Sequence, residues 1–76
     1  MLKFGVWLSS CPKKARHKAA LLLVPHLGLI RAEEAVRDPG GRCITFHKTL
    51  REAQDLANEL KALGCSANGA EEASWP

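Results

Sequence analysis

Apolar and polar residues alternate over the first nine positions, which predicts a β-strand with one buried face. The apolar positions are Leu2, Phe4, Val6 and Leu8, and between them stand Lys3, Gly5, Trp7 and Ser9. Successive side chains of a strand point to opposite faces. We therefore expect the first set to lie against the core, whereas Trp7 falls on the polar side of the strand.

A first helix is predicted from Pro12 to about Leu23. Ser10 or Cys11 can cap its start, and Pro12 suits the first helical position, where its missing N–H would have no partner anyway. The apolar positions of this helix are Ala15, Ala19, Leu22 and Leu23. Pro25 ends the helix in this interpretation, because the residue before a proline avoids helical geometry.

Two more helices follow along the chain. The shorter one comes after the Leu-Gly-Leu connector at residues 27–29 and stops at the Pro-Gly-Gly sequence of residues 39–41; its apolar positions are Ala32, Ala35 and Val36. The last helix has the clearest boundaries, because Thr49 and Glu52 form a capping box and Gly64 is a suitable terminator. Its apolar stripe consists of Leu50, Ala53, Leu56, Ala57, Leu60 and Leu63.

A short second strand is predicted around residues 43–46. We expect Ile44 and Phe46 to share its buried face, and Cys43 and Thr45 to share the other face. Residues 65–67 can add a brief third strand. From Asn68 onward the residues are small and polar, so we predict a disordered tail over residues 68–76.

The predicted order is strand, helix, helix, strand, helix and a short final strand. This order is typical of an α+β fold, here a small two- to three-stranded antiparallel sheet covered on one face by three helices. We expect one domain over residues 1–67, since a chain of 76 residues is too short for two.

The cysteine content and the apolar runs indicate in which compartment we expect the protein. Cys11, Cys43 and Cys65 have no disulfide-framework spacing, so we expect them to be reduced and the protein to be cytoplasmic. The first residues lack the basic and then apolar order of a signal peptide. The longest apolar run, residues 19–25, is far shorter than the ~20 residues that cross a bilayer, so we expect no membrane partner.

Positive charge is concentrated in the first half of the chain. Six basic residues precede the first acidic residue, Glu33, although the formal net charge is only +3. Such a field attracts an acidic protein surface, which is the partner we predict, and nucleic acid is a less favoured alternative because few aromatic residues are available to stack on bases. The candidate partner-binding residues are Trp7, Lys13, Lys14, Arg16, His17, Lys18 and Arg31.

The chain resembles two related families, the C-terminal domain of the bacterial ribosomal stalk protein and the ClpS-type adaptors of the Clp protease. The connector at residues 27–29, followed by Ala32 and Val36, is similar to the leucine-glycine-leucine helix entry of the stalk domain. The capped last helix, from Thr49 to Gly64, is similar to the last helix of that domain. The resemblance implies a non-enzymatic module that docks other proteins, in the stalk domain through its first two helices.

One departure from these families limits what the resemblance implies. The ClpS-type adaptors bind the amino group of a destabilising N-terminal residue through an asparagine and acidic residues after the first strand. This chain has Ser9, Ser10 and Cys11 there, and an ammonium group requires carboxylates to hold it. We therefore expect no amine-binding pocket.

Catalysis has one candidate residue. Cys11 stands before Pro12 at a predicted helix N-terminus beside two lysines, where the helix dipole could activate a thiol. No second cysteine follows at a redox-motif spacing, and no serine, glycine-rich loop or carboxylate pair adds a catalytic motif. We predict no enzyme activity, no cofactor and no metal, since the histidines and cysteines match no familiar zinc pattern.

Two further alternatives remain open from the sequence. A SPOR-like peptidoglycan-binding domain has a similar order of elements, but it would require residues 29–36 to form a strand, and this segment favours a helix. The chain could also be a carrier that presents its own C-terminal tail, with Trp75, as a peptide ligand.

Overall fold

The computed structural model describes residues 3–71. Its elements are β1 (Phe4–Ser10), the 3₁₀ helix η1 (Lys13–Ala15), α1 (Arg16–Leu27), α2 (Leu29–Arg37), β2 (Arg42–His47), α3 (Leu50–Ala62) and β3 (Ser66–Glu71). The predicted α+β fold and its order of elements are confirmed. Since Leu29–Arg37 is helical, the SPOR-like alternative, which needs a strand there, is wrong.

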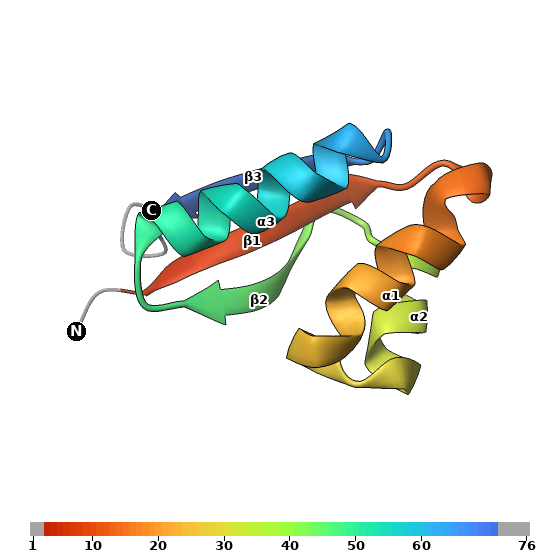
Figure 1. The fold of residues 1–76 in the computed structure, drawn as a ribbon, viewed down its shortest axis with the longest axis horizontal. Coiled ribbons are helices and arrows are strands. Elements are labelled where there is room, and N and C mark those ends of the chain that lie inside the picture. Colours follow the sequence, from red (N-terminus) through yellow and green to blue (C-terminus); the bar gives the residue numbers. More distant parts are fainter. Residues whose placement is uncertain (1–2, 72–76) are drawn as a thin grey trace.

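The sheet has the order β2-β1-β3, and both neighbours run antiparallel to β1. Phe4 of the central strand pairs with His47 on one side and with Glu71 on the other. Figure 1 shows that α3 lies along one face of the sheet. The α1–α2 hairpin lies beside the C-terminal end of β1. The largest fully buried side chains in the core between them are those of Val6, Leu8, Leu23 and Leu60.

The third strand is longer than predicted. Asn68 to Glu71 belong to β3, so the prediction of a disordered tail is wrong for residues 68–71, and the domain extends beyond residue 67. The rest of that predicted tail, including Trp75, lies outside the described residues. Residues 68–71 form a strand because β1 supplies an antiparallel partner for their backbone groups, although their own side chains have low β-propensity.

A β-bulge in β2 changes which of its side chains point toward the core. Val6 pairs with Thr45 and Trp7 pairs with Cys43, so Ile44 is an extra residue between two successive pairs. Thr45 is therefore buried on the core face, and Phe46 is 55% exposed on the open face of the sheet. The predicted burial of Phe46 is wrong, because the simple alternation from Ile44 does not hold across a bulge.

The last helix forms as predicted from its local signals. The Thr49 hydroxyl accepts a hydrogen bond from the Glu52 amide at 3.2 Å. At the other end Gly64 has a φ of 99°, and the amides of Gly64 and Cys65 donate to the carbonyls of Lys61 and Leu60. This is the Schellman arrangement, in which a glycine in left-handed geometry ends the helix. It turns the chain sharply into β3.

The first helix differs from the prediction at both ends. Pro12 is extended and precedes the helix, and the Ala15 amide donates to its carbonyl at 2.9 Å. Pro25 lies inside α1, which continues to Leu27. A proline this close to a helix end removes only one internal hydrogen bond. The Gly28 amide then donates to Val24 at 2.9 Å and closes the last turn around Pro25.

Candidate functional site

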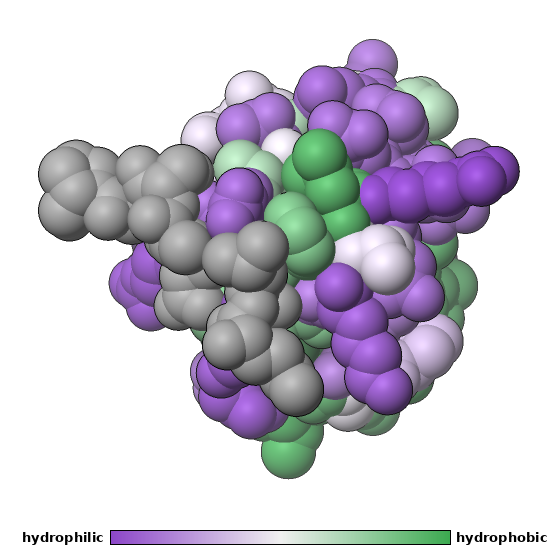
Figure 2. All heavy atoms as spheres, turned by 90° about the vertical axis from the view of Figure 1, so that its left-hand side faces the viewer, coloured by the Kyte–Doolittle hydropathy of each residue, from purple (hydrophilic) through white to green (hydrophobic). Residues whose placement is uncertain are grey.

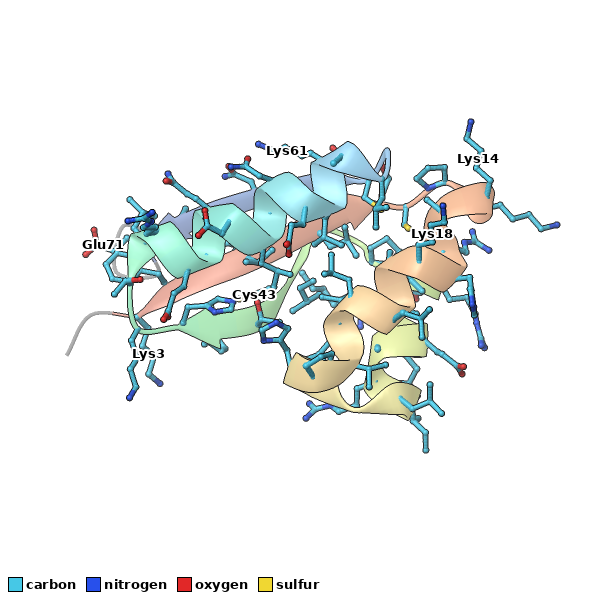
Figure 3. All side chains as sticks on the ribbon, viewed as in Figure 1. Lys3, Lys14, Lys18, Cys43, Lys61 and Glu71 are labelled. Carbon is cyan, nitrogen blue, oxygen red and sulfur yellow. The ribbon has the colours of Figure 1, made fainter. Side chains whose placement is uncertain are left out.

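The lysine-rich segment forms one basic cluster at an end of the molecule. Lys13 and Lys14 lie in η1, and Arg16, His17 and Lys18 form the first turn of α1. Figure 3 shows Lys14 and Lys18 extending outward from this end. Within residues 3–71, no carboxylate forms an ion pair with these three lysines. Their charges are therefore available to a partner.

The exposed side of α1 continues this cluster with apolar residues. We call this exposed side the outer stripe of α1. It begins with Lys14 of η1 and continues along α1 with His17, Lys18, Leu21 and Pro25, all of them exposed. Residues three or four apart share one side of a helix. Leu21 therefore lies beside His17 and Lys18, and 56% of its surface is exposed although Ala19 and Leu23 of the same helix are fully buried. The stripe combines positive charge with an aliphatic contact.

The tip of the hairpin adds two more exposed apolar side chains. Gly28, with a φ of 83°, reverses the chain between α1 and α2. Leu29 and Ile30 begin α2 and are 59% and 72% exposed, respectively. Only Ala32 and Val36 of α2 are buried, so Ile30 lies off the buried side of this helix. The apolar pattern already contained this signal, but sequence reasoning missed it, as it missed Leu21.

Among residues 3–71, the opposite end of the molecule has fewer exposed large apolar side chains. Figure 2 views the end where β2 finishes and α3 begins, and it shows a small apolar area surrounded by hydrophilic residues. The exposed apolar residues of these two elements are Phe46 and Leu50. The larger exposed aliphatic group therefore belongs to the hairpin.

The structure does not bring Trp7 to the basic cluster. Trp7 lies on the open face of the sheet, and its indole covers Gly5, where an added Cβ would come within 2.9 Å of the ring. Cys43 lies beside them, since its Sγ would be 2.7 Å from the same Cβ. Trp7 is half-buried in this position. It serves as a lid over the glycine in the central strand.

Arg31 is separate from the basic cluster as well. It lines a cleft of about 360 Å³ between α2 and the start of β2. Arg37 and Arg42 share this cleft with Glu34 and Asp38. The Arg42–Asp38 pair is 3.6 Å long, with side chains 72% and 82% exposed, so it contributes little to stability.

Arg16 links the basic cluster to a second hollow. This hollow, of about 230 Å³, lies between α1 and α2, and its lining includes Arg16, His17, Glu33 and Arg37. The Nε of Arg16 is buried and has no hydrogen-bond partner. A buried donor without an acceptor is destabilising, which makes this nitrogen a natural position for an acceptor from a bound molecule.

The thiol of Cys11 is not placed as a nucleophile. Cys11 is buried, and its Sγ lies 3.0 Å from the Sγ of Cys65, which is buried too. Burial and the contact with Cys11 raise the pKa of Cys65 to about 12. A nucleophilic cysteine needs access and an electropositive surrounding. The geometry therefore gives no support to the enzyme alternative.

Two histidines meet where α1 approaches β2. The rings of His26 and His47 stack edge to face at 5.5 Å, and Nε2 of His47 is 2.8 Å from the Thr45 hydroxyl. Burial, with a smaller effect of His26, lowers the pKa of His47, and Glu52 acts in the opposite direction. Within the described part of the chain, no group of three metal-ligating side chains gathers here or elsewhere.

This histidine contact predicts a pH-dependent stability. In the unfolded chain His47 takes up a proton near its ordinary pKa of about 6.5, whereas the folded protein resists that proton. The contribution of the neutral, partly buried His47 to the free energy of unfolding is therefore fully present above its ordinary pKa of about 6.5. This contribution is lost as the pH falls below that value, through the lower pKa of the folded state. Urea unfolding across this range should show the decline, and His47→Gln should flatten it. An unchanged slope in the variant would contradict the assignment to His47.

A search for membrane-spanning helices and three comparisons with known proteins complete the description of the chain. No helix within residues 3–71 is long and apolar enough to cross a bilayer. Comparisons with family models, with curated proteins and with solved structures give no significant match to this chain. The similarity to the stalk and ClpS-type domains thus remains a prediction from the residues.

Proposed function

We propose that this chain is a small, non-enzymatic docking module that binds an acidic protein segment with the outer stripe of α1 and the hairpin tip. The observation that carries the proposal is the exposed Leu21 beside Lys18 on α1, together with two further exposed aliphatic side chains at the tip of the same hairpin. Leu21, Leu29 and Ile30 are more than half exposed, and all three lie on the α1–α2 hairpin. Exposed apolar groups rimmed by charge are typical of protein interaction sites.

The charge of this surface favours an acidic partner that also has apolar residues. Lys14 and Lys18 would attract carboxylates and speed the encounter, and Leu21 would then be covered by an aliphatic side chain. Such a partner matches both the charge and the apolar contacts of the stripe.

The resemblance to the stalk and ClpS-type domains supports the same surface. Those families use this order of elements to dock proteins, and the stalk domain does so through its first two helices. We extend the proposal to a ClpS-like or stalk-like fold relationship and to a cytoplasmic partner. The cytoplasmic setting depends only on the cysteine content.

Nucleic acid is less favoured because the two kinds of contact that it needs are separated. The aromatic side chains Trp7 and Phe46 lie on the sheet, where the Lys3 ammonium is 5.6 Å from the centre of the Phe46 ring. Lys14 and Lys18 lie at the other end of the molecule from Lys3 (Figure 3). Base stacking on these rings and phosphate binding by the basic cluster of Lys14 and Lys18 would therefore not occur on one surface.

A charge-reversal experiment tests the docking surface. We expect the double variant Lys14→Glu, Lys18→Glu to fold normally and to lose partner affinity by at least about tenfold, because attraction becomes repulsion. The matched control is Lys48→Glu, Lys61→Glu, in which two exposed lysines, one just before α3 and one in its last turn, are reversed. Each variant has a net charge of −1, since two substitutions lower +3 by four.

The measurement is affinity capture from host extract with the full chain as bait, quantified by mass spectrometry. The proteins captured by the wild type should be retained by the control and lost with the Lys14 and Lys18 variant. They should also be lost by raising the salt, because surface attraction is screened. Equal capture by both double variants would refute the proposed surface.

A further inference from the structure

We propose that Cys11 and Cys65 are a redox-responsive pair that closes into an intramolecular disulfide when the protein meets a small disulfide oxidant such as glutathione disulfide. This inference is independent of the proposed docking function. It revises the expectation that all three cysteines stay reduced, because no spacing in the sequence indicates that any two of them should pair.

The strand register places the two thiols opposite each other. Ser10 of β1 pairs with Ser66 of β3 in an antiparallel register, and Cys11 and Cys65 are the next residues beyond this pair. Directly opposed residues of antiparallel strands have Cβ atoms roughly 5 Å apart, whereas a disulfide requires about 3.8 Å. The register therefore brings the two thiols near each other, and a small approach of the two segments is needed for the bond.

The sulfur atoms themselves are in contact. Their separation is 3.0 Å, and a disulfide bond is about 2.05 Å long, so closure needs a movement of about 1 Å. The backbone beside the two cysteines is also close together: Gly64 lies against Pro12, and a Cβ added to Gly64 would be 3.5 Å from the proline ring, an ordinary contact distance. The end of α3 and the start of η1 are thus packed together before any bond forms.

The third cysteine is kept apart from this pair. The Cys43 thiol lies on the open face of the sheet and donates a hydrogen bond to the Thr45 carbonyl at 3.3 Å. The sheet separates it from Cys11 and Cys65, which belong to the buried core. Pairing should therefore be selective although three thiols are present.

The reaction is a thiol–disulfide exchange in two steps. Because Cys11 is buried, a local opening of the chain around it must first expose its thiol. The Cys11 thiolate then attacks glutathione disulfide, which forms a mixed disulfide and releases one glutathione, and this glutathione takes the proton of Cys11. The Cys65 sulfur then attacks Sγ of Cys11 and releases the second glutathione, which takes the proton of Cys65. One protein disulfide forms, two S–H bonds are lost, and the oxidant is reduced to two thiols. Excess reduced glutathione reverses both steps.

Closure would constrain most of the chain. The two cysteines are 54 positions apart, so the loop between them includes the hairpin, β2 and α3. A cross-link over a long loop removes many conformations from the unfolded state. We expect the melting temperature of the oxidised protein to exceed that of the reduced protein by more than about 10 °C.

Peptide mapping of the full chain tests the pairing. The folded protein is incubated with glutathione disulfide, alkylated, and digested with trypsin without reduction. Cleavage after lysine and arginine puts the three cysteines in separate peptides, residues 4–13, 43–48 and 62–76. We expect the first and third to be linked, the second to be alkylated, and the link and the higher melting temperature to disappear after reduction.

Two variants complete the test. Cys43→Ala should give the same link and the same temperature shift as the wild type, whereas Cys65→Ser should give neither. The wild-type map alone decides the question if Cys65→Ser fails to fold. A link through Cys43, a disulfide between two chains, or alkylation of both Cys11 and Cys65 after oxidation would overturn the proposal.

Discussion

Replacing Gly69 with valine is expected to destabilise the protein by about 3 kcal/mol. A Cβ at this position would lie 2.9 Å from the carbonyl carbon and oxygen of Ala53 and 3.0 Å from the Gln54 amide nitrogen. These are backbone atoms of α3, so no side-chain rotation can relieve the contact. The helix would have to move away from β3, which would loosen the packing of Ala53 and Ala57, two residues that are almost fully buried.

Urea unfolding followed by circular dichroism measures this effect. The matched control is Ala70→Val, on the next residue of β3, which faces the opposite side of the sheet. Valine is favoured in strands, so the control should change the free energy of unfolding by no more than about 0.5 kcal/mol. Equal stability of the two variants would contradict the close approach of α3 to Gly69.

The second large effect is expected for Leu8→Ala, with a loss of about 2–5 kcal/mol. Leu8 is fully buried on the central strand. Its truncation removes apolar contacts and leaves a cavity between the sheet and the helices, which the surrounding core cannot fill completely. A domain of this size has a total stability of roughly 4–11 kcal/mol, so the variant should be partly unfolded at physiological temperature.

Leu21→Ala is the control for this prediction. It removes the same side chain from a position that is 56% exposed, so the free energy of unfolding should change by less than about 0.5 kcal/mol. Under the proposed function, this same variant should weaken partner capture because Leu21 belongs to the outer stripe of α1. Comparable destabilisation of both leucine variants would contradict the described core.

Local signals explain how much of the fold the sequence could predict. The α3 helix was predicted between its true ends because Thr49, Glu52 and Gly64 act within one turn of the chain. The central strand was predicted because its alternation is unbroken from Leu2 to Leu8. The bulge at Ile44 and the length of β3 escaped prediction, because both depend on pairing with β1, whose register no local pattern encodes.

The candidate site also has one part that local sequence predicts and another that depends on the topology. The basic cluster was predicted because its members are neighbours in the chain and share one helical turn. Trp7 and Arg31 were grouped with it by residue type, yet the topology puts them on the sheet and at the cleft beside α2. The contact between Cys11 and Cys65 arises only from the strand register, and neither cysteine has a local signal for it.

The central position of β1 affects how the protein is made. β1 precedes both of its partner strands along the chain, and its outermost pair joins Phe4 to Glu71. Contacts between residues this distant in sequence slow folding, because the intervening chain must be ordered first. A nascent chain that has reached only Gly64 has one side of β1 unpaired. The complete sheet therefore forms only after residues 66–71 have been synthesised.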